Sequence, residues 1–274
     1  MCDLLGLTFT TNITANISLN LFQEHGMKNP DGWGLAFYNE GVLQVIKEAK
    51  TAIDSGLYDF MERYTSSKTI ISHVRRSTRG IPSYLNTHPF YRRLVLNDRK
   101  LEIAFAHNGT ITDVDCLSSG KFAPIGETDS EIAFCHILNN ISSQKDFKWD
   151  IKGFRFLMTN LREINDGQNT MNCIFSDGNH LFCYSDENDH NNGLRFTKQE
   201  FPFGKVELER AETSLGFIDI SGSDSKRSNR HIPSGYIIST RILTKETWIE
   251  FERGELIVFK DGRIIFPANR VKSD

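Results

Sequence analysis

The chain has 274 residues, and its 32 Lys plus Arg against 35 Asp plus Glu leave a formal net charge of −3. This balance argues against a dedicated nucleic-acid-binding protein, and the 39% hydrophobic content with 20 glycines excludes disordered and collagen-like chains. The apolar runs fall short of the roughly 18 residues that span a membrane, and Asp3 lies in an N-terminus without a basic segment, so we expect a cytoplasmic protein with neither membrane span nor signal peptide.

Short apolar runs separated by turn residues dominate the first half of the chain. Residues 2–10 predict a strand that begins at Cys2, and apolar side chains at helical spacing predict a helix over 14–25. The turn at 39–41 joins two strands into a hairpin. The remaining predicted elements are the hairpin strands 33–38 and 42–48, a helix over 54–65 with Leu57, Phe60 and Met61 as its apolar stripe, and buried strands over 69–74 and 101–106.

The second half predicts two helices followed by strands. Thr128 is the expected N-cap of the first helix, because Glu131 three residues later completes a capping-box pattern. We expect polar loops over 186–194 and 220–232, and their role stays open. Strands, then helices, then strands again predict a single α+β domain over 1–274, with helices packed on antiparallel sheets. The other predicted elements are a helix over 151–164 and strands over 171–176, 181–185, 235–240, 248–252, 255–259 and 263–266.

Five cysteines occur, an odd number that cannot all pair within one chain. No Cys or His spacing matches a zinc site, so we expect reduced thiols and no metal. Four of the five are expected to be small core residues: Cys116, Cys135, Cys173 and Cys183.

The fifth cysteine, Cys2, is distinguished by its position. Removal of Met1 would make it the first residue, and a free α-amine with a pKa of about 7.7–8.0 could then act as a base for its own thiol. This arrangement applies the logic of the N-terminal threonine nucleophile to a thiol. Taken alone, Cys2 is better explained as an ordinary strand cysteine in a chain that keeps Met1 than as a nucleophile, because short motifs often match by chance.

The segment Ala106-His107-Asn108-Gly109-Thr110 follows a buried strand. An acyl-transfer reaction needs donors aimed at the oxyanion, and the Asn108 amide with the Gly109 N–H could supply two. A plain turn is the simpler interpretation of Asn-Gly taken alone.

Charged and polar residues follow other predicted strands. Arg75 at a strand end could bind a carboxylate with two hydrogen bonds. Asp129, at the start of a helix, either stabilises the helix dipole or binds an ammonium group. His88 is either a structural hydrogen-bonding residue or a wall of the site. A thiol, an oxyanion hole, an arginine and an aspartate together suit a free amino acid with a side-chain acyl group, and glutamine is the obvious candidate.

An ordered set of short motifs runs through the first half of the chain: Met1-Cys2, HxR followed by STRG at 73–80, NTHPF at 86–90, HNG at 107–109 and ETDSE at 127–131. With this set, the chain resembles the class II glutamine amidotransferase domain of the N-terminal-nucleophile hydrolases. Met1–Gly6 and Asp31–Gly34 add a likeness to a stand-alone bacterial subgroup. One departure is His25-Gly26, where relatives often carry Arg-Gly.

This resemblance implies a four-layer αββα sandwich of two antiparallel sheets flanked by helices. It implies that Cys2 attacks the γ-carbonyl of glutamine and forms a γ-glutamyl thioester, with Asn108 and Gly109 as the oxyanion hole. The substrate-binding residues that it implies are Arg75 for the α-carboxylate with Thr78 nearby, Asp129 for the α-ammonium, and His88 in a supporting role. Neither a metal nor an organic cofactor is expected, since neither step of the hydrolysis needs one.

Three functions remain open at this point. The first is glutamine hydrolysis, with ammonia released or passed to a separate acceptor protein, because we expect no room for a fused synthase domain within 274 residues. The second is hydrolysis of a γ-glutamyl peptide or γ-glutamyl amine by the same mechanism. Arg75 and Asp129 would bind only the glutamyl group, which these substrates share with glutamine. The third is a non-catalytic scaffold, which would not need Cys2 at the mature terminus.

Overall fold

Two antiparallel β-sheets face each other in the computed structural model, which describes residues 2–14, 23–117, 120–200, 206–207, 217–218 and 233–271. The seven-stranded sheet has the order β13-β9-β12-β1-β4-β2-β3 and comprises β1 (Asp3–Thr14), β2 (Gly32–Asn39), β3 (Val42–Glu48), β4 (Ser66–Arg75), β9 (Arg195–Glu200), β12 (Ser234–Ser239) and β13 (Ile249–Glu250). The six-stranded sheet has the order β15-β14-β8-β7-β6-β5 and comprises β5 (Phe90–Leu96), β6 (Arg99–Thr110), β7 (Thr170–Ser176), β8 (His180–Tyr184), β14 (Leu256–Lys260) and β15 (Arg263–Phe266).

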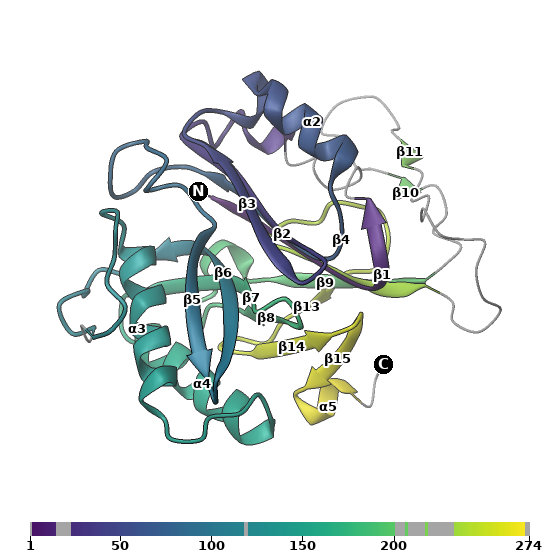
Figure 1. Ribbon diagram of the computed structural model, residues 1–274. Helices are drawn as coiled ribbons and strands as arrows, with labels where there is room; N and C mark the ends of the chain where they lie inside the picture. Colours follow the sequence, from purple (N-terminus) through teal and green to yellow (C-terminus); the bar gives the residue numbers. More distant parts are fainter. Residues whose placement is uncertain are drawn as a thin grey trace.

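Helices cover the outer face of each sheet (Figure 1). The seven-stranded sheet carries η1 (Ala52–Asp54) and α2 (Gly56–Tyr64), and the six-stranded sheet carries α3 (Asp129–Ser143) and α4 (Ile151–Ile164). The short elements that complete the described structure are η2 (His190–Asn192), α5 (Ala268–Val271) and the strand pair β10 (Val206–Glu207) and β11 (Phe217–Ile218). No described helix combines the length and apolar character needed to cross a bilayer.

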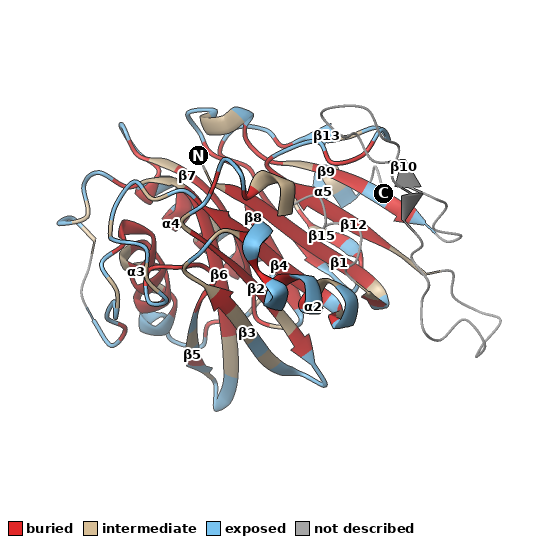
Figure 2. Ribbon diagram, turned by 90° about the horizontal axis from the view of Figure 1, so that it is seen from above, coloured by how far each residue is buried: buried red, intermediate tan, exposed pale blue. Residues whose placement is uncertain are grey.

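Strand alternation produces three apolar layers. In β1, Leu4 faces the space between the sheets, whereas Leu5 packs outward in the cluster that contains α2 residues. In β6, Ala106 faces inward and Phe105 stacks outward on Phe134 of α3 with ring centroids 4.9 Å apart. The central strands are therefore buried along most of their length, whereas edge strands such as β3 and β5 are not (Figure 2). This arrangement confirms the predicted α+β class and the αββα sandwich.

Local signals account for several element boundaries. The Thr128 side chain accepts a hydrogen bond from the Glu131 N–H at 3.2 Å, so Thr128 is the N-cap of α3 as predicted. The Glu131 carboxylate bonds to the N–H of Gly126 at 2.7 Å, outside the reciprocal geometry of a capping box. The hairpin between β2 and β3 turns through Glu40 and Gly41, both with positive φ, as expected for a two-residue turn.

The orientation of α2 differs from the prediction. Leu57 and Phe60 are 41% and 55% exposed, and Tyr58 and Met61 are the buried residues of this helix. The Tyr58 ring makes an edge contact with Trp33 at 4.9 Å, which turns this side of the helix toward the sheet. The expected stripe of Leu57, Phe60 and Met61 was therefore wrong for two of its three members.

Other differences concern edges and loops. Strands β5 and β9 were not predicted, because only some residues of each are buried and charged side chains interrupt both. Cys116 is exposed in a loop, where its Sγ donates to the carbonyl of Asp113, so the expectation that it lies in the core was wrong. The predicted helix over 14–25 was wrong at Thr14, which belongs to β1. Residues 15–22 and 219–232 lie outside the described residues, and with them most of that predicted helix and all of the 220–232 loop.

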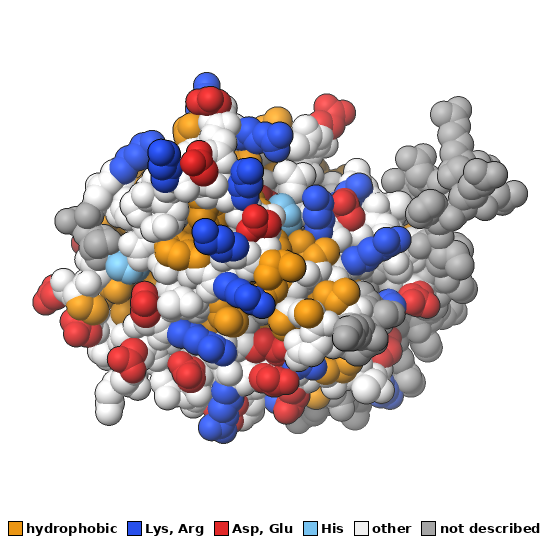
Figure 3. Space-filling view, turned by 90° about the horizontal axis from the view of Figure 1, so that it is seen from below, with side chains coloured by type: hydrophobic (Ala, Val, Ile, Leu, Met, Phe, Trp, Pro, Cys, Tyr) orange, Lys and Arg blue, Asp and Glu red, His pale blue; other side chains and the backbone are white. Residues whose placement is uncertain are grey.

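The surface mixes charges of both signs. On the face seen from below in Figure 3, Lys and Arg side chains alternate with Asp and Glu around exposed hydrophobic side chains. This pattern agrees with the small net charge of −3.

Candidate active site

Cys2 lies directly before β1, beside the end of β4. The antiparallel register of these strands pairs Asp3 with Val74, so the residues after β4 reach the thiol. The Cys2 Sγ donates to the Arg76 carbonyl at 3.3 Å and accepts from the Arg76 N–H at 3.2 Å. Burial raises the pKa of the thiol, although the Arg76 N–H and the Arg75 charge act against this shift. A protonated thiol of this kind needs a base before it can react.

Asp3 anchors the backbone that follows Cys2. Its buried carboxylate accepts from His25 Nδ1 at 3.0 Å, from Asn29 Nδ2 at 3.3 Å and from Arg241 Nε at 2.9 Å. Burial acts to raise the pKa of Asp3, but the hydrogen bonds and charges of His25 and Arg241 outweigh it and hold this pKa below its usual range. His25 therefore pairs with the residue next to Cys2.

Asn108 reaches Cys2 from the other sheet. Its Nδ2 donates to the Cys2 carbonyl oxygen at 2.7 Å, and its Oδ1 accepts from Asn191 Nδ2 at 3.0 Å. Gly109 follows in β6, where an added Cβ would collide with the Thr170 carbonyl and lie 2.6 Å from His107 Nε2. Only glycine lets the two strands approach this closely.

Arg75 ends β4 and is 3% exposed. Its guanidinium donates to the carbonyls of Arg79 at 3.0 Å and Gly80 at 3.3 Å, which folds the following loop back over the strand end. Burial lowers the pKa of Arg75, whereas the nearby acidic groups, including Asp129, act to raise it. The two candidate substrate-binding charges are thus close enough to interact.

Asp129 occupies the first position of α3. Its Oδ2 accepts from the Ile111 N–H at 2.6 Å, which joins the helix to the end of β6. His107 strengthens this junction, because its Nδ1 lies 2.8 Å from Ser130 Oγ and its Nε2 lies 3.0 Å from the Thr170 carbonyl. The first turn of α3 is therefore fixed to the strand that carries Asn108.

Two other candidate residues lie differently. His88 is 4% exposed, with its ring 4.3 Å from that of His73 and 4.5 Å from that of Phe90. Neither of its ring nitrogens has a hydrogen-bond partner among the described residues, and burial lowers its pKa well below the usual range. Thr78 is exposed on the loop after β4. The structure brings Cys2, Arg75, Asn108, Gly109 and Asp129 together, while His88 lies in the interior and Thr78 on the surface.

Sequence reasoning missed two residues that hold this cluster. Asp31 appeared only in the likeness at Asp31–Gly34 and was given no role, yet its Oδ2 accepts from the Ser77 N–H at 2.7 Å and its N–H donates to the Arg75 carbonyl at 3.0 Å. That likeness was the signal that could have indicated it. Asn191 lies in the 186–194 loop, and no local pattern pointed to its contact with Asn108.

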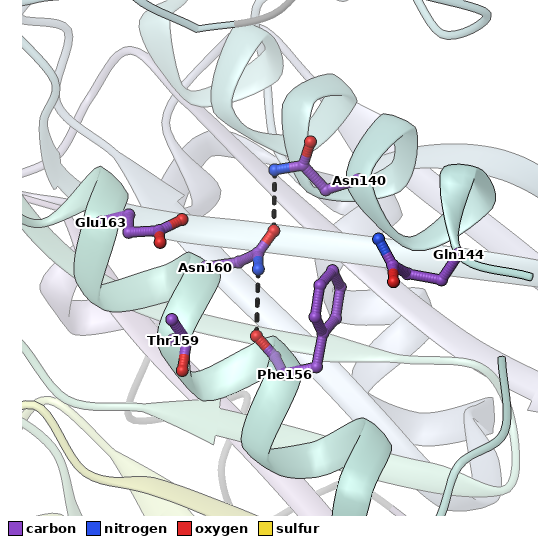
Figure 4. Close-up of a pocket in the computed structure, with 6 residues that line it drawn as sticks. All are labelled: Asn140, Gln144, Phe156, Thr159, Asn160 and Glu163. Atoms are coloured by element: carbon purple, nitrogen blue, oxygen red, sulfur yellow. Dashed lines mark hydrogen bonds between the residues drawn. The ribbon is translucent and has the colours of Figure 1, made fainter.

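A separate pocket lies between α3 and α4 (Figure 4). Across it, Asn140 Nδ2 donates to Asn160 Oδ1 at 2.7 Å, and Asn160 Nδ2 donates to the Phe156 carbonyl at 3.0 Å. None of the candidate catalytic or substrate-binding residues lines it. The lining residues are Asn140, Gln144, Phe156, Thr159, Asn160 and Glu163.

Known sequences resemble this chain over nearly its whole length. The family model described as "Glutamine amidotransferases class-II" matches residues 1–273. Protein MJ1515 of Methanocaldococcus jannaschii is 38% identical over 273 residues, which cover 99% of this chain and 72% of that protein. A protein of Escherichia coli K12 named "Putative glutamine amidotransferase YafJ" is 28% identical over 270 residues, which cover 94% of this chain and 97% of that protein.

Solved structures share the fold. A "predicted glutamine amidotransferase" from Pseudomonas aeruginosa PA01 superimposes with a TM-score of 0.69 at 26% identity, covering 97% of this chain and all of that one. The glutamine phosphoribosylpyrophosphate amidotransferase of B. subtilis superimposes with a TM-score of 0.58 at 16% identity and covers 96% of this chain and 48% of that one, a likeness of fold alone. With its family match over 1–273, this chain belongs to the class II glutamine amidotransferases.

Proposed function

We propose that this protein hydrolyses the γ-carboxamide of glutamine to glutamate and ammonia through Cys2. The observation that carries the proposal is the 2.7 Å hydrogen bond from Asn108 Nδ2 to the Cys2 carbonyl. It sets an oxyanion-type donor beside the residue that bears the thiol. Family membership supports the reaction class.

The reaction proceeds in two steps. After removal of Met1, the α-amine of Cys2 accepts the thiol proton, and Sγ attacks the γ-carbonyl carbon. The C–N bond then breaks, the amine returns the proton to the departing ammonia, and a γ-glutamyl thioester remains. Water hydrolyses the thioester to glutamate. Because burial raises the pKa of Cys2, an adjacent base is required, and an α-amine with a pKa of about 7.7–8.0 is suited to this role.

Asn108 and Gly109 stabilise the oxyanion in both steps. The Asn108 amide has two N–H groups, and the Cys2 carbonyl is the one acceptor recorded for them among the described residues. The second N–H can therefore donate to the oxyanion together with the Gly109 N–H.

The charges around Cys2 select the glutamyl group. Arg75 binds the α-carboxylate and Asp129 binds the α-ammonium. Their electrostatic coupling supports this assignment, since a zwitterionic amino acid presents both charges on one carbon. Ammonia is released or transferred to a separate acceptor protein.

The test combines intact-mass measurement with substrate turnover. We expect a mature chain lacking Met1 that releases glutamate from glutamine, a Cys2→Ala variant without activity, and full activity in Cys116→Ala, which removes the exposed thiol. Retention of Met1 in an active enzyme would contradict the mechanism. Turnover of γ-glutamyl peptides or amines in preference to glutamine would favour the alternative substrate class, and absence of all turnover would contradict the proposed activity.

A further inference from the structure

Asn108 can serve as an oxyanion donor only in one of its two amide orientations. A 180° rotation of its carboxamide exchanges Nδ2 and Oδ1, which would turn an acceptor toward Cys2. The Cys2 carbonyl is itself an acceptor, so it favours Nδ2 on its side. On the opposite side, the Asn191 Nδ2 donates to Asn108 Oδ1 at 3.0 Å and favours the same orientation.

We propose that Asn191 is a positioning residue of the glutamine-hydrolysing reaction, which holds the Asn108 amide with its N–H groups toward Cys2. This inference rests on the proposed function and extends it to the 186–194 loop. Asn191 acts through Asn108 and does not touch the substrate.

The backbone at Asn191 is unusual in a way that agrees with this role. Asn191 has φ 55° and ψ 26°, and Asp189, Asn192 and Gly193 also have positive φ. This left-handed region is unfavourable for most residues and best tolerated by Gly, Asn and Asp. A run of such residues persists only where surrounding contacts determine it.

Buried contacts next to Asn108 hold this loop. Asn172, the cross-strand partner of Asn108 in β7, donates from Nδ2 to the His190 carbonyl at 2.8 Å. Asp186 accepts from the His190 N–H through Oδ2 at 2.9 Å and donates its own N–H to Asn172 Oδ1 at 2.9 Å. Both Asn172 and Asp186 are fully buried. The strand position opposite Asn108 thus anchors the loop that carries Asn191.

The decisive variant is Asn191→Asp, which keeps the size and tolerates positive φ. Its carboxylate accepts only, so it attracts Asn108 Nδ2 and turns Oδ1 toward Cys2. Loss of one oxyanion donor typically costs about 100- to 1,000-fold, and we expect kcat to fall about 100-fold with KM changed less than about twofold. Asn191→Gly, which keeps the backbone and removes the amide, should lose about tenfold in kcat.

Two measurements distinguish positioning from a general structural role. Alkylation of Cys2 by iodoacetamide, followed by peptide mass spectrometry, forms an S–C bond at a saturated carbon with loss of iodide and needs no oxyanion donor. Its rate should equal that of the wild type in both Asn191 variants. Asn192→Asp is the matched control, because Asn192 is exposed in the same loop with φ 59°, and it should keep wild-type kcat.

The outcomes separate the two proposals. Suppose that the wild type is active. If Asn191→Asp then keeps wild-type kcat, or if its Cys2 alkylation slows as much as its turnover, the role of Asn191 is overturned and the proposed function stays intact. A wild type that releases no glutamate from glutamine or from any γ-glutamyl compound would contradict the proposed function, and the role of Asn191 with it.

Discussion

Asn108 in the six-stranded sheet donates a 2.7 Å hydrogen bond to the carbonyl of Cys2 at the start of the seven-stranded sheet. The bond joins residues 106 positions apart in the chain. The proposed nucleophile and the proposed oxyanion donor therefore belong to different sheets, and their relative position depends on how the sheets pack. Substitutions at the contact between Asn108 and Cys2 should therefore affect turnover more than the stability of the fold.

Replacement of Asn108 by alanine tests this expectation directly. We predict that Asn108→Ala loses about 100- to 1,000-fold in kcat, because one oxyanion donor is removed. The free energy of unfolding should fall by only about 1–3 kcal/mol, the usual cost of leaving a buried partner unsatisfied. Steady-state kinetics and denaturant unfolding measure the two effects, with exposed Asn179→Ala as the control. Retention of wild-type kcat in a folded Asn108→Ala protein would exclude the residue from the mechanism.

Asp129→Asn removes a charge while keeping an acceptor for the Ile111 N–H. A charged hydrogen bond contributes about 1.5–3 kcal/mol, so we expect KM for glutamine to rise about 10- to 100-fold with a smaller change in kcat. Glu163→Gln, on α4 and outside the site, serves as the control for loss of a negative charge. An unchanged KM would show that Asp129 only fixes the start of α3.

Lys47 should make the free energy of unfolding depend on pH in the alkaline range. It is 9% exposed, donates to the Thr87 carbonyl at 2.7 Å, and burial lowers its pKa from 10.5 to about 8. Between pH 8 and 10.5 the unfolded chain binds a proton that the folded chain has lost. The contribution of Lys47 to stability therefore rises with pH across this window, by at most about 3 kcal/mol.

This change is measured against Lys47→Met, which cannot titrate. Urea unfolding at pH 8, 9 and 10 should show the wild type gaining stability relative to the variant, while all other titrating groups cancel. A difference in unfolding free energy that stays constant over this range would contradict the lowered pKa of Lys47.

Acid should destabilise the fold through His73. This histidine is fully buried against His88, and burial lowers its pKa from 6.5 to about 3. Between these values the unfolded chain binds a proton that the folded chain does not, so stability falls as pH decreases from 6.5 toward 3. His73→Met should reduce the slope of unfolding free energy against pH by up to about 1.4 kcal/mol per pH unit. Parallel slopes for variant and wild type would show that His73 takes up its proton in the folded state.

Sequence reasoning succeeded where a signal is contained within a few residues. The β2–β3 hairpin follows from its turn residues, and Thr128 as the N-cap of α3 follows from its spacing to Glu131. The predicted buried face of α2 was wrong, because the distribution of apolar residues along this helix does not determine which of its faces packs on the sheet. The Trp33 ring, more than twenty residues earlier in the chain, decides that orientation.

The sequence alone determined the candidate chemical groups: a cysteine at position 2, the His-Asn-Gly segment, and the charges at Arg75 and Asp129. Only the tertiary structure decided which of them meet. Antiparallel pairing of β1 with β4 brings Arg75 and Arg76 to Cys2, and the stacking of the second sheet brings Asn108. The hydrogen bond from Asn191 to Asn108 arises the same way, because the buried residues Asp186 and Asn172 hold the neighbouring His190. Local propensity depends on neighbouring residues, whereas these contacts depend on how distant strands pack.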